Sequence, residues 1–233
     1  VYGLTKFKNG EENIQNHIEN RFRDIGYTVK SKILYASDFG VPQRRNRLFI
    51  VGNRNGIDFE FPKEFDYSVS VDEAISDLPV LGNGEIQMKG EYTVPFEQAS
   101  PYAQLMRKKS KAPTQNIVSR NKDYVVERYK YIGQGENWSS IPDRLMENYA
   151  DKKRCHSGIY KRLIGGKPSV VISNYRKSML IHPHQDRGLS VREAARLQSF
   201  PDHFIFEGPV SYVQQQIGNA VPPLLAKAVM KKI

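Results

Sequence analysis

Gln43, Arg45 and Arg47 are the first residues in the sequence whose types and spacing could do chemistry. Alternate side chains of an extended segment lie on one face, so all three are predicted to point the same way. Such a trio can donate several hydrogen bonds to one planar, oxygen-bearing ligand or to phosphates. Three solvated polar side chains at the edge of a hairpin are the alternative.

A helix start near the C-terminal end is the second candidate. Ser190 and Glu193 form a capping-box pattern, in which the hydroxyl accepts a main-chain hydrogen bond and the carboxylate reaches back. The helix is predicted to run to about Gln198, and Pro201 should stop it. Most of this segment is expected to be structural.

The third candidate is the segment Gln216–Pro223. Its Gly218-Asn219 pair suits a left-handed or sharply turned backbone that presents polar main-chain groups beside a helix start. The sequence therefore predicts a helix over Ser211–Ile217, a break at this pair, and a last helix over Pro222–Lys231. The break could contact a small ligand or could simply join the two helices.

A predicted hairpin positions the first trio. Strand-like runs span Thr28–Tyr35 and Leu48–Val51, and the polar loop Ser37–Arg47 joins them. That loop is too long for a tight turn, and loops on a rigid sheet often carry function. An amphipathic helix is predicted before the hairpin, ending at Gly26, with its apolar face formed by Ile14, Ile18, Phe22 and Ile25.

The middle of the chain, residues 82–184, has scattered Gly, Pro, Ser and Asn and only short apolar runs. It is predicted to be an irregular, mostly β module that interrupts an α/β domain. The 233 residues include 35 Lys and Arg against 25 Asp and Glu, for a net charge of +10. Residues 101–130 carry +6 and residues 151–167 carry +5 of this charge. Such concentration favours a polyanion such as nucleic acid, although a solvated basic face is the alternative.

The composition also excludes several classes of protein. No apolar run approaches the length of a membrane span, and no signal-peptide pattern opens the sequence. A single cysteine, Cys155, excludes an internal disulfide framework and indicates a reducing, intracellular setting. The pairs Cys155-His156 and His182/His184 are too sparse for a structural zinc site, so no metal is expected.

In this order and spacing, the three segments resemble the C-terminal half of the C5-cytosine DNA methyltransferases. Gln43-x-Arg45-x-Arg47 is similar to motif VIII of that family, Arg192–Asp202 to motif IX, and Gln216–Val221 to motif X. The segment between the first two motifs lies where the family places its target-recognition domain. The resemblance therefore covers essentially the whole chain.

The resemblance implies an α/β fold: the C-terminal part of a Rossmann-like S-adenosylmethionine-dependent methyltransferase domain, interrupted by a small, irregular, mostly β target-recognition domain. Residues 1–81 would belong to the large catalytic domain, with motif VIII. Residues 82–184 would form the recognition domain, and residues 185–233 would return to the catalytic domain with motifs IX and X.

The resemblance also implies roles for particular residues. In this family a cytosine is flipped out of duplex DNA, a cysteine attacks its C6, and C5 takes the methyl group of S-adenosylmethionine. Gln43, Arg45 and Arg47 would be the catalytic set: Arg47 would contact O2 of the cytosine, and Arg45 would hold the pocket and its neighbouring acidic group. Asn219, Ala220 and Val221 would line the cofactor pocket. The expected DNA-contacting residues are basic: Arg107, Lys108, Lys109, Lys111, Lys153, Arg154, Arg176 and Lys177.

The family's earlier motifs are absent from the sequence: there is no Phe-x-Gly-x-Gly loop, no Pro-Cys loop and no Glu-Asn-Val, of which Val1 would be the last residue. Cys155 lacks a preceding Pro and is interpreted as structural or DNA-facing. Many members also have a Thr that meets a phosphate where this chain has Val171. Ser173, Arg176 or Lys177 would replace that contact.

The expected partners are double-stranded DNA and an N-terminal catalytic half, from the same polypeptide or a separate subunit. The chain is expected to be inactive alone, and to self-associate or require that half, because half a sheet leaves an exposed edge. A bacterial or phage origin and a cytoplasmic location are expected, with no membrane partner. The alternative is a catalytically silent DNA-binding subunit that modulates a partner methyltransferase, against which Arg45, Arg47 and Asn219 count. An RNA-binding protein has no recognisable motif behind it.

Overall fold

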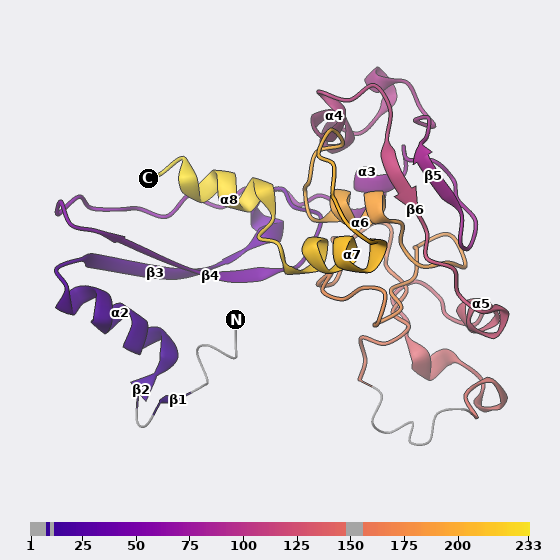
Figure 1. The fold of residues 1–233 in the computed structure, drawn as a ribbon, viewed down its shortest axis with the longest axis horizontal. Helices are drawn as coiled ribbons and strands as arrows, with labels where there is room; N and C mark the ends of the chain where they lie inside the picture. Colours follow the sequence, from indigo (N-terminus) through magenta and orange to yellow (C-terminus); the bar gives the residue numbers. More distant parts are fainter. Residues whose placement is uncertain (1–7, 10–11, 148–155) are drawn as a thin grey trace.

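The structure, a computed structural model, describes residues 8–9, 12–147 and 156–233. It has two parts side by side along its longest axis: a hairpin with its covering helices, and a more irregular lobe built around α6 (Figure 1). The strands are β1 (Lys8–Asn9), β2 (Glu12–Asn13), β3 (Thr28–Tyr35), β4 (Asn46–Asn53), β5 (Ile86–Lys89) and β6 (Thr114–Ile117). The helices are α2 (Ile14–Asp24), α3 (Val71–Ile75), α4 (Pro101–Arg107), α5 (Asp123–Tyr129), α6 (Val191–Leu197), α7 (Val210–Asn219) and α8 (Pro223–Met230). Short 3-10 turns span Ala36–Phe39, Phe96–Gln98, Trp138–Ser140 and Asp143–Leu145.

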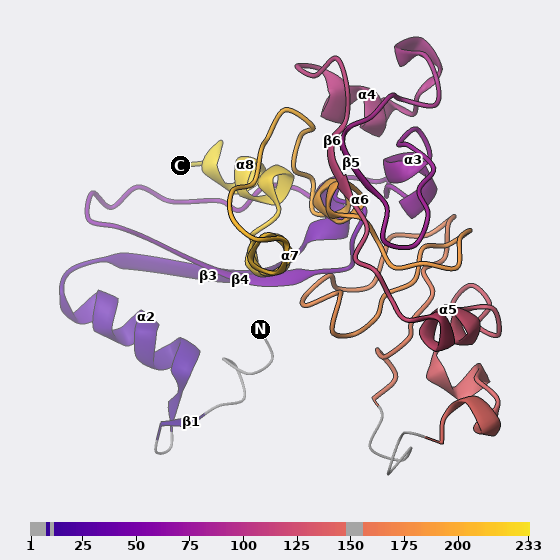
Figure 2. The same ribbon diagram turned by 45° about the vertical axis from the view of Figure 1, so that its right-hand side comes forward.

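The hairpin unit, residues 14–61 together with α8, is formed by β3 and β4, which pair antiparallel from Thr28↔Asn53 to Tyr35↔Asn46. The predicted first strand is confirmed, and the predicted second strand lies inside β4. The helices α2 and α8 lie on opposite sides of the hairpin (Figures 1 and 2). Because side chains alternate along a strand, Ser31 faces α2 while Leu34 faces α8. The hydrophobic core on the α8 side includes Leu34, Ala36, Phe39, Val41, Phe59, Leu225 and Val229.

The α6 lobe has a larger core that draws on α3, α4, α6 and α7. Every residue of α6 is buried, and the predicted capping box is present: Ser190 Oγ accepts from Glu193 N, and the Glu193 carboxylate accepts from Ser190 N. A helix that is buried on all sides must place its polar residues against partners inside the protein. The arginines of α6 do so, as described below.

Two sequence predictions are corrected by the fold. Among the described residues of the 82–184 segment, β5 and β6 are the only strands, and α4 and α5 contain more residues than they do, so the segment is irregular but not mostly β. The helix before the Gly218-Asn219 pair continues through Asn219 instead of breaking there. In the hydrophobic cores, α6 and α7 pack against residues 69–117, whereas α8 packs on the hairpin.

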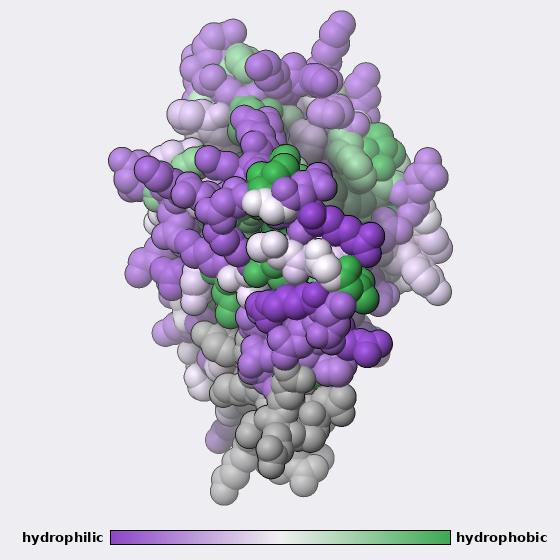
Figure 3. All heavy atoms as spheres, turned by 90° about the vertical axis from the view of Figure 1, so that its left-hand side faces the viewer, coloured by the Kyte–Doolittle hydropathy of each residue, from purple (hydrophilic) through white to green (hydrophobic). Residues whose placement is uncertain are grey.

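The described residues form three separate two-stranded antiparallel sheets. The fold class is therefore mixed α/β, with a long hairpin as its most regular sheet. On the face shown in Figure 3 the surface is mostly hydrophilic, and hydrophobic residues form separate patches. None of the described helices combines the length and the apolar character that crossing a membrane requires.

Candidate functional site

The loop between β3 and β4 places Gln43 and Arg45 in the interior. The 3-10 turn Ala36–Phe39 ends at Gly40, whose φ of 74° is a left-handed conformation that suits glycine. Ala36 N then donates to Arg45 O at 2.7 Å, which closes the loop. A short parallel bridge joins Gln43 to Ser169 and so attaches the loop to the α6 lobe.

Gln43 is fully buried and joins two other segments by its amide. Its Nε2 donates to Leu197 O at 3.1 Å, at the end of α6, and its Oε1 accepts from Ile172 N at 3.0 Å. Both ends of the amide are therefore satisfied by main chain. Gln43 holds the hairpin loop, the segment around residue 172 and the end of α6 in one arrangement.

Arg45 forms a second link, directly beside the first. Its Nη1 donates to Ile172 O at 2.9 Å and its Nη2 donates to Gly218 O at 2.7 Å. The side chain is 3% exposed, and its Nε has no hydrogen-bond partner. No carboxylate of the described residues pairs with it. A buried guanidinium with an orphan donor and no counter-charge is costly.

Arg47, at the start of β4, differs from its two neighbours in the motif. It is half-buried, and its Nη1 donates to Asn46 O at 2.9 Å. Burial lowers the pKa of its guanidinium from the ordinary value. The three side chains therefore do not present their donors to a single ligand, because Gln43 and Arg45 donate to main-chain carbonyls. Arg47 retains donors for a further partner.

The turn between α7 and α8 carries the motif X residues. Gly218 lies inside α7 against the main chain of Ser173, where an added Cβ would come within 2.0 Å of Ser173 O. Its role is close approach, not the left-handed turn that the sequence suggested. Asn219 and Val221 are exposed and Ala220 is half-buried, immediately after this contact. Ser199 Oγ accepts from Leu224 N at 3.1 Å and ties the start of α8 to the end of α6.

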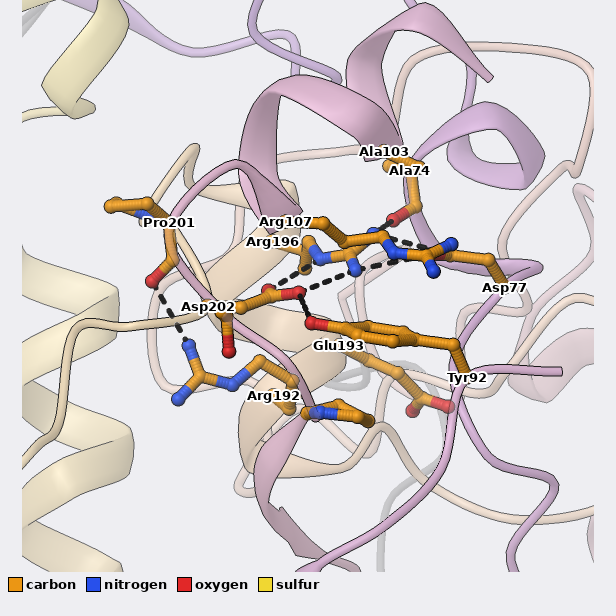
Figure 4. Close-up of polar contacts among 12 residues, drawn as sticks. Ala74, Asp77, Tyr92, Ala103, Arg107, Arg192, Glu193, Arg196, Pro201 and Asp202 are labelled. Atoms are coloured by element: carbon orange, nitrogen blue, oxygen red, sulfur yellow. Dashed lines mark hydrogen bonds and ion pairs between the residues drawn. The ribbon is translucent and has the colours of Figure 1, made fainter. Parts of the chain in front are cut away.

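A buried ionic network supports this arrangement from within the α6 lobe (Figure 4). Arg196 lies between two carboxylates: its Nε donates to Asp202 at 2.6 Å and its Nη1 donates to Asp77 at 2.8 Å. The hydroxyl of Tyr92 donates to Asp202 at 2.6 Å, and Arg107 approaches Asp77 at 3.4 Å. Burial alone would raise the pKa of Asp202, but the hydrogen bonds and charge of Arg196 hold it below its ordinary value.

A second buried pair lies at the other end of α6. Arg187 donates to both oxygens of Glu193, at 2.7 and 2.9 Å, in a bidentate arrangement. Burial would raise the pKa of Glu193, yet the adjacent Arg187 lowers it to about 2. His182 lies near the same carboxylate, and its burial lowers its pKa to about 4. In the segment similar to motif IX, the charged side chains Glu193, Arg196 and Asp202 are thus paired inside the protein.

The expected DNA-contacting residues fall into three groups. Lys108, Lys109, Lys111, Arg176 and Lys177 are exposed. Arg107 is buried against Asp77 and over the ring of Tyr92, so it is removed from the set. Lys153 and Arg154, together with Cys155, lie outside the described residues.

The net charges of residues 101–130 and 151–167 also overstate the basic surface, because some of their arginines are buried. Arg128 donates to Leu145 O and to the Tyr160 hydroxyl, and Arg162 donates to four main-chain oxygens and to Asp186. Both guanidiniums are buried. Counting charges along the sequence could not distinguish them from exposed lysines. Asp77 and Tyr92, which complete the network, were also missed, because no local pattern marks a partner that lies far away in the sequence.

No group of three or more His, Cys, Asp or Glu side chains that could hold a metal ion occurs in the part of the chain that the structure describes. The site as described consists of main-chain links around Gln43 and Arg45, the partly exposed Arg47, and the exposed turn after Gly218.

Comparison with known proteins identifies the family. The pattern of the C-5 cytosine-specific DNA methylases matches residues 1–233. The Type II methyltransferase M1.HphI of Haemophilus parahaemolyticus is 34% identical over 93% of this chain and 50% of its own length. M.DdeI of Desulfomicrobium norvegicum is 32% identical over 100% of this chain and 61% of its own length. The chain thus spans about half to three fifths of these curated relatives.

A solved structure shows the same fold. It is an Escherichia coli protein, described as a DNA modification methyltransferase encoded within a prophage, with a TM-score of 0.71 and 22% identity over 97% of this chain and 65% of that chain. The chain belongs to the C-5 cytosine-specific DNA methylase family. Members of this family use S-adenosylmethionine as the methyl donor.

Proposed function

We propose that this chain is the C-terminal part of a DNA (cytosine-5-)-methyltransferase, which transfers a methyl group to C5 of a cytosine flipped from a specific duplex site. The observation that carries the proposal is the pair of main-chain links made by Gln43 and Arg45. They bring the hairpin loop, Ile172 and the ends of α6 and α7 to one place. A protein that only binds DNA has no need for that convergence beside Arg47.

Arg47 is the residue that would contact the flipped base. It is half-buried and keeps hydrogen-bond donors beyond its link to Asn46 O. A fixed positive donor beside O2 of the cytosine would stabilise the electron-rich covalent adduct. Arg45, with its orphan Nε, would hold the acidic group of the same pocket, and Gln43 would fix the loop that carries both arginines.

Asn219, Ala220 and Val221 would form one wall of the cofactor site. The fit rests on their position: they are at least partly exposed at the turn between α7 and α8, and the side-chain amide of Asn219 has no hydrogen-bond partner among the described residues. S-adenosylmethionine, when bound, supplies an electrophilic methyl group. These residues would orient the cofactor, while the rest of its pocket would come from an N-terminal half.

DNA would be held by exposed basic residues of the α6 lobe. Lys108, Lys109 and Lys111 follow α4, and Arg176 and Lys177 lie a few residues after Ile172. Their charges would contact phosphates and contribute affinity without reading sequence. Lys153 and Arg154 are retained in the proposal on the sequence alone. The relatives' names suggest a place beside a restriction enzyme.

The nucleophilic cysteine would come from the N-terminal half, in the same polypeptide or a separate subunit, so this chain would be inactive alone. The test measures transfer of a labelled methyl group from S-adenosylmethionine to unmethylated duplex DNA, first by this chain and then with that half added. No transfer alone and transfer on addition is expected. Transfer by the chain alone would overturn the proposal that the nucleophile lies in the N-terminal half. No transfer in either case would favour a silent DNA-binding subunit.

Arg47→Ala sharpens the test. In the complemented enzyme we expect its turnover to fall about 10²–10³-fold, because one charged donor to the reacting base is lost. Arg54→Ala is the matched control, since Arg54 lies on the hairpin beyond β4 and donates to Ile25 O. The Arg54→Ala variant should keep the wild-type turnover. Equal losses in the two variants would mean that the hairpin, and not the Arg47 contact, sets the rate.

A further inference from the structure

One guanidinium joins two segments that the proposed function assigns to different ligands. Arg45 donates through Nη1 to Ile172 O at 2.9 Å and through Nη2 to Gly218 O at 2.7 Å. We infer that Arg45 is a positioning residue that couples the DNA-contacting segment to the cofactor wall. This inference rests on the proposed function and deepens it.

The two segments also touch directly, main chain against main chain. A Cβ on Gly218 would lie 2.0 Å from Ser173 O and 2.7 Å from the Ser173 carbonyl carbon. No residue but glycine fits such a contact unless the backbone moves. Because Arg45 holds the carbonyls of Ile172 and Gly218 at the same junction, neither segment can shift without displacing the other.

The junction lies directly before both groups of proposed ligand-binding residues. Arg176 and Lys177 follow Ser173 by a few residues, and Asn219 follows Gly218 immediately. DNA bound to Arg176 and Lys177 therefore fixes the position of Asn219. Coupling of this kind is reciprocal, so a bound cofactor must strengthen DNA binding by the same factor. The coupling lies in the junction and not in contacts between the two ligands.

Arg45→Lys tests the inference in the chain complemented with its N-terminal half. Lysine keeps the charge, but its single ammonium lacks the planar fork that spans two carbonyls. The measurement is the dissociation constant of S-adenosylhomocysteine with and without unmethylated duplex DNA of mixed sequence. The wild type should show coupling of about 5–150-fold, and Arg45→Lys should reduce it to about 1–2-fold.

Arg192→Lys is the matched control. Arg192 is equally buried and also joins two segments, through Thr114 O and Phe204 O, but away from the junction. It should lose stability while its coupling stays at the wild-type value. Loss of coupling in both variants would mean that general destabilisation, and not the bridge, is responsible, and would overturn the inference.

The outcomes separate this inference from the proposed function. If the wild type binds neither ligand, the proposed function fails. If it binds both and Arg45→Lys keeps the full coupling, only the inference fails. If Arg45→Lys does not fold, amide exchange in the wild type replaces it: duplex DNA should slow exchange at the Ala220 amide, which donates to Gln216 O. Unchanged exchange at that amide would overturn the inference.

Discussion

The hairpin unit and the α6 lobe hold their charges in opposite ways. In the hairpin unit the ion pairs Lys30–Asp58 and Arg23–Glu19 each keep at least one exposed partner. In the α6 lobe, Arg196 and Asp202 are both 0% exposed and the Asp77 side chain is 3% exposed. An exposed pair is screened by water, whereas a buried carboxylate without its partner keeps the full cost of desolvation. The hairpin unit is therefore fixed by strand register and apolar packing, and the α6 lobe by charge geometry.

Arg196→Met should give the largest effect and tests this contrast directly. It leaves Asp77 and Asp202 buried without their shared partner, and we expect a loss of about 3–5 kcal/mol in the free energy of unfolding. Lys30→Met, which breaks the exposed pair, should cost less than about 1 kcal/mol. Urea denaturation followed by circular dichroism measures both. Similar losses in the two variants would remove the distinction between the regions.

His182 provides the next test, through pH. Its pKa falls from the ordinary 6.5 to about 4, because burial disfavours the charged form. The unfolded chain therefore binds a proton that the folded chain does not, and the free energy of unfolding should decrease as pH falls from about 7 to 4. The decrease should approach about 3 kcal/mol. Glu193, with a pKa of about 2, adds a further loss below its ordinary value of 4.5.

His182→Gln separates the two contributions. The variant has no imidazole to protonate, so its stability should change little between pH 7 and 5 and should still fall below pH 4.5. Denaturation at several pH values in that range measures the difference. If the variant keeps the slope of the wild type, another group titrates there and His182 is not the source of the acid sensitivity.

Predictability from sequence also differs between the two regions. The limits of β3 follow from a local pattern of β-forming residues, and the amphipathic α2 follows from its apolar spacing, so both were predictable. The start of α6 was predictable too, because a capping box is local. Family resemblance then supplied the grouping of the three motifs, which no periodicity gives.

The features that escaped prediction all depend on distant partners. The sequence suggests a turn at Gly218, but glycine is required there because the main chain of Ser173 leaves no room for a Cβ. Arg107 looked like a surface cation, but Asp77 and the ring of Tyr92 enclose it. The buried roles of Gln43 and Arg45 depend on carbonyls from α6 and α7. A residue type shows which bonds are available, and only tertiary packing decides which partner takes them.

The smallest predicted effect comes from comparing one motif, the capping box, in two environments. The capping box occurs at Ser70 on α3, where the side chains are partly exposed, and at Ser190 on α6, where Ser190 is 1% exposed. Ser70→Ala should cost about 0.5–1 kcal/mol, because water can replace the lost hydroxyl. Ser190→Ala should cost about 2 kcal/mol, because the Glu193 amide is then left buried without an acceptor.

Urea denaturation of the two variants measures this difference under one condition. Both substitutions remove a hydroxyl that accepts from the helix, since Glu73 N and Glu193 N donate to their serines at 3.2 and 3.1 Å, and Ser70→Ala also removes the bond from Ser70 Oγ to Glu73 Oε2 at 2.6 Å. Helix propensity and the change in side-chain size are therefore matched. A larger loss at Ser190 would show that burial, and not the capping bond itself, sets the energy scale of the α6 lobe. Equal losses would mean that the Glu193 amide finds another acceptor, and the contrast between the regions would then apply to charges alone.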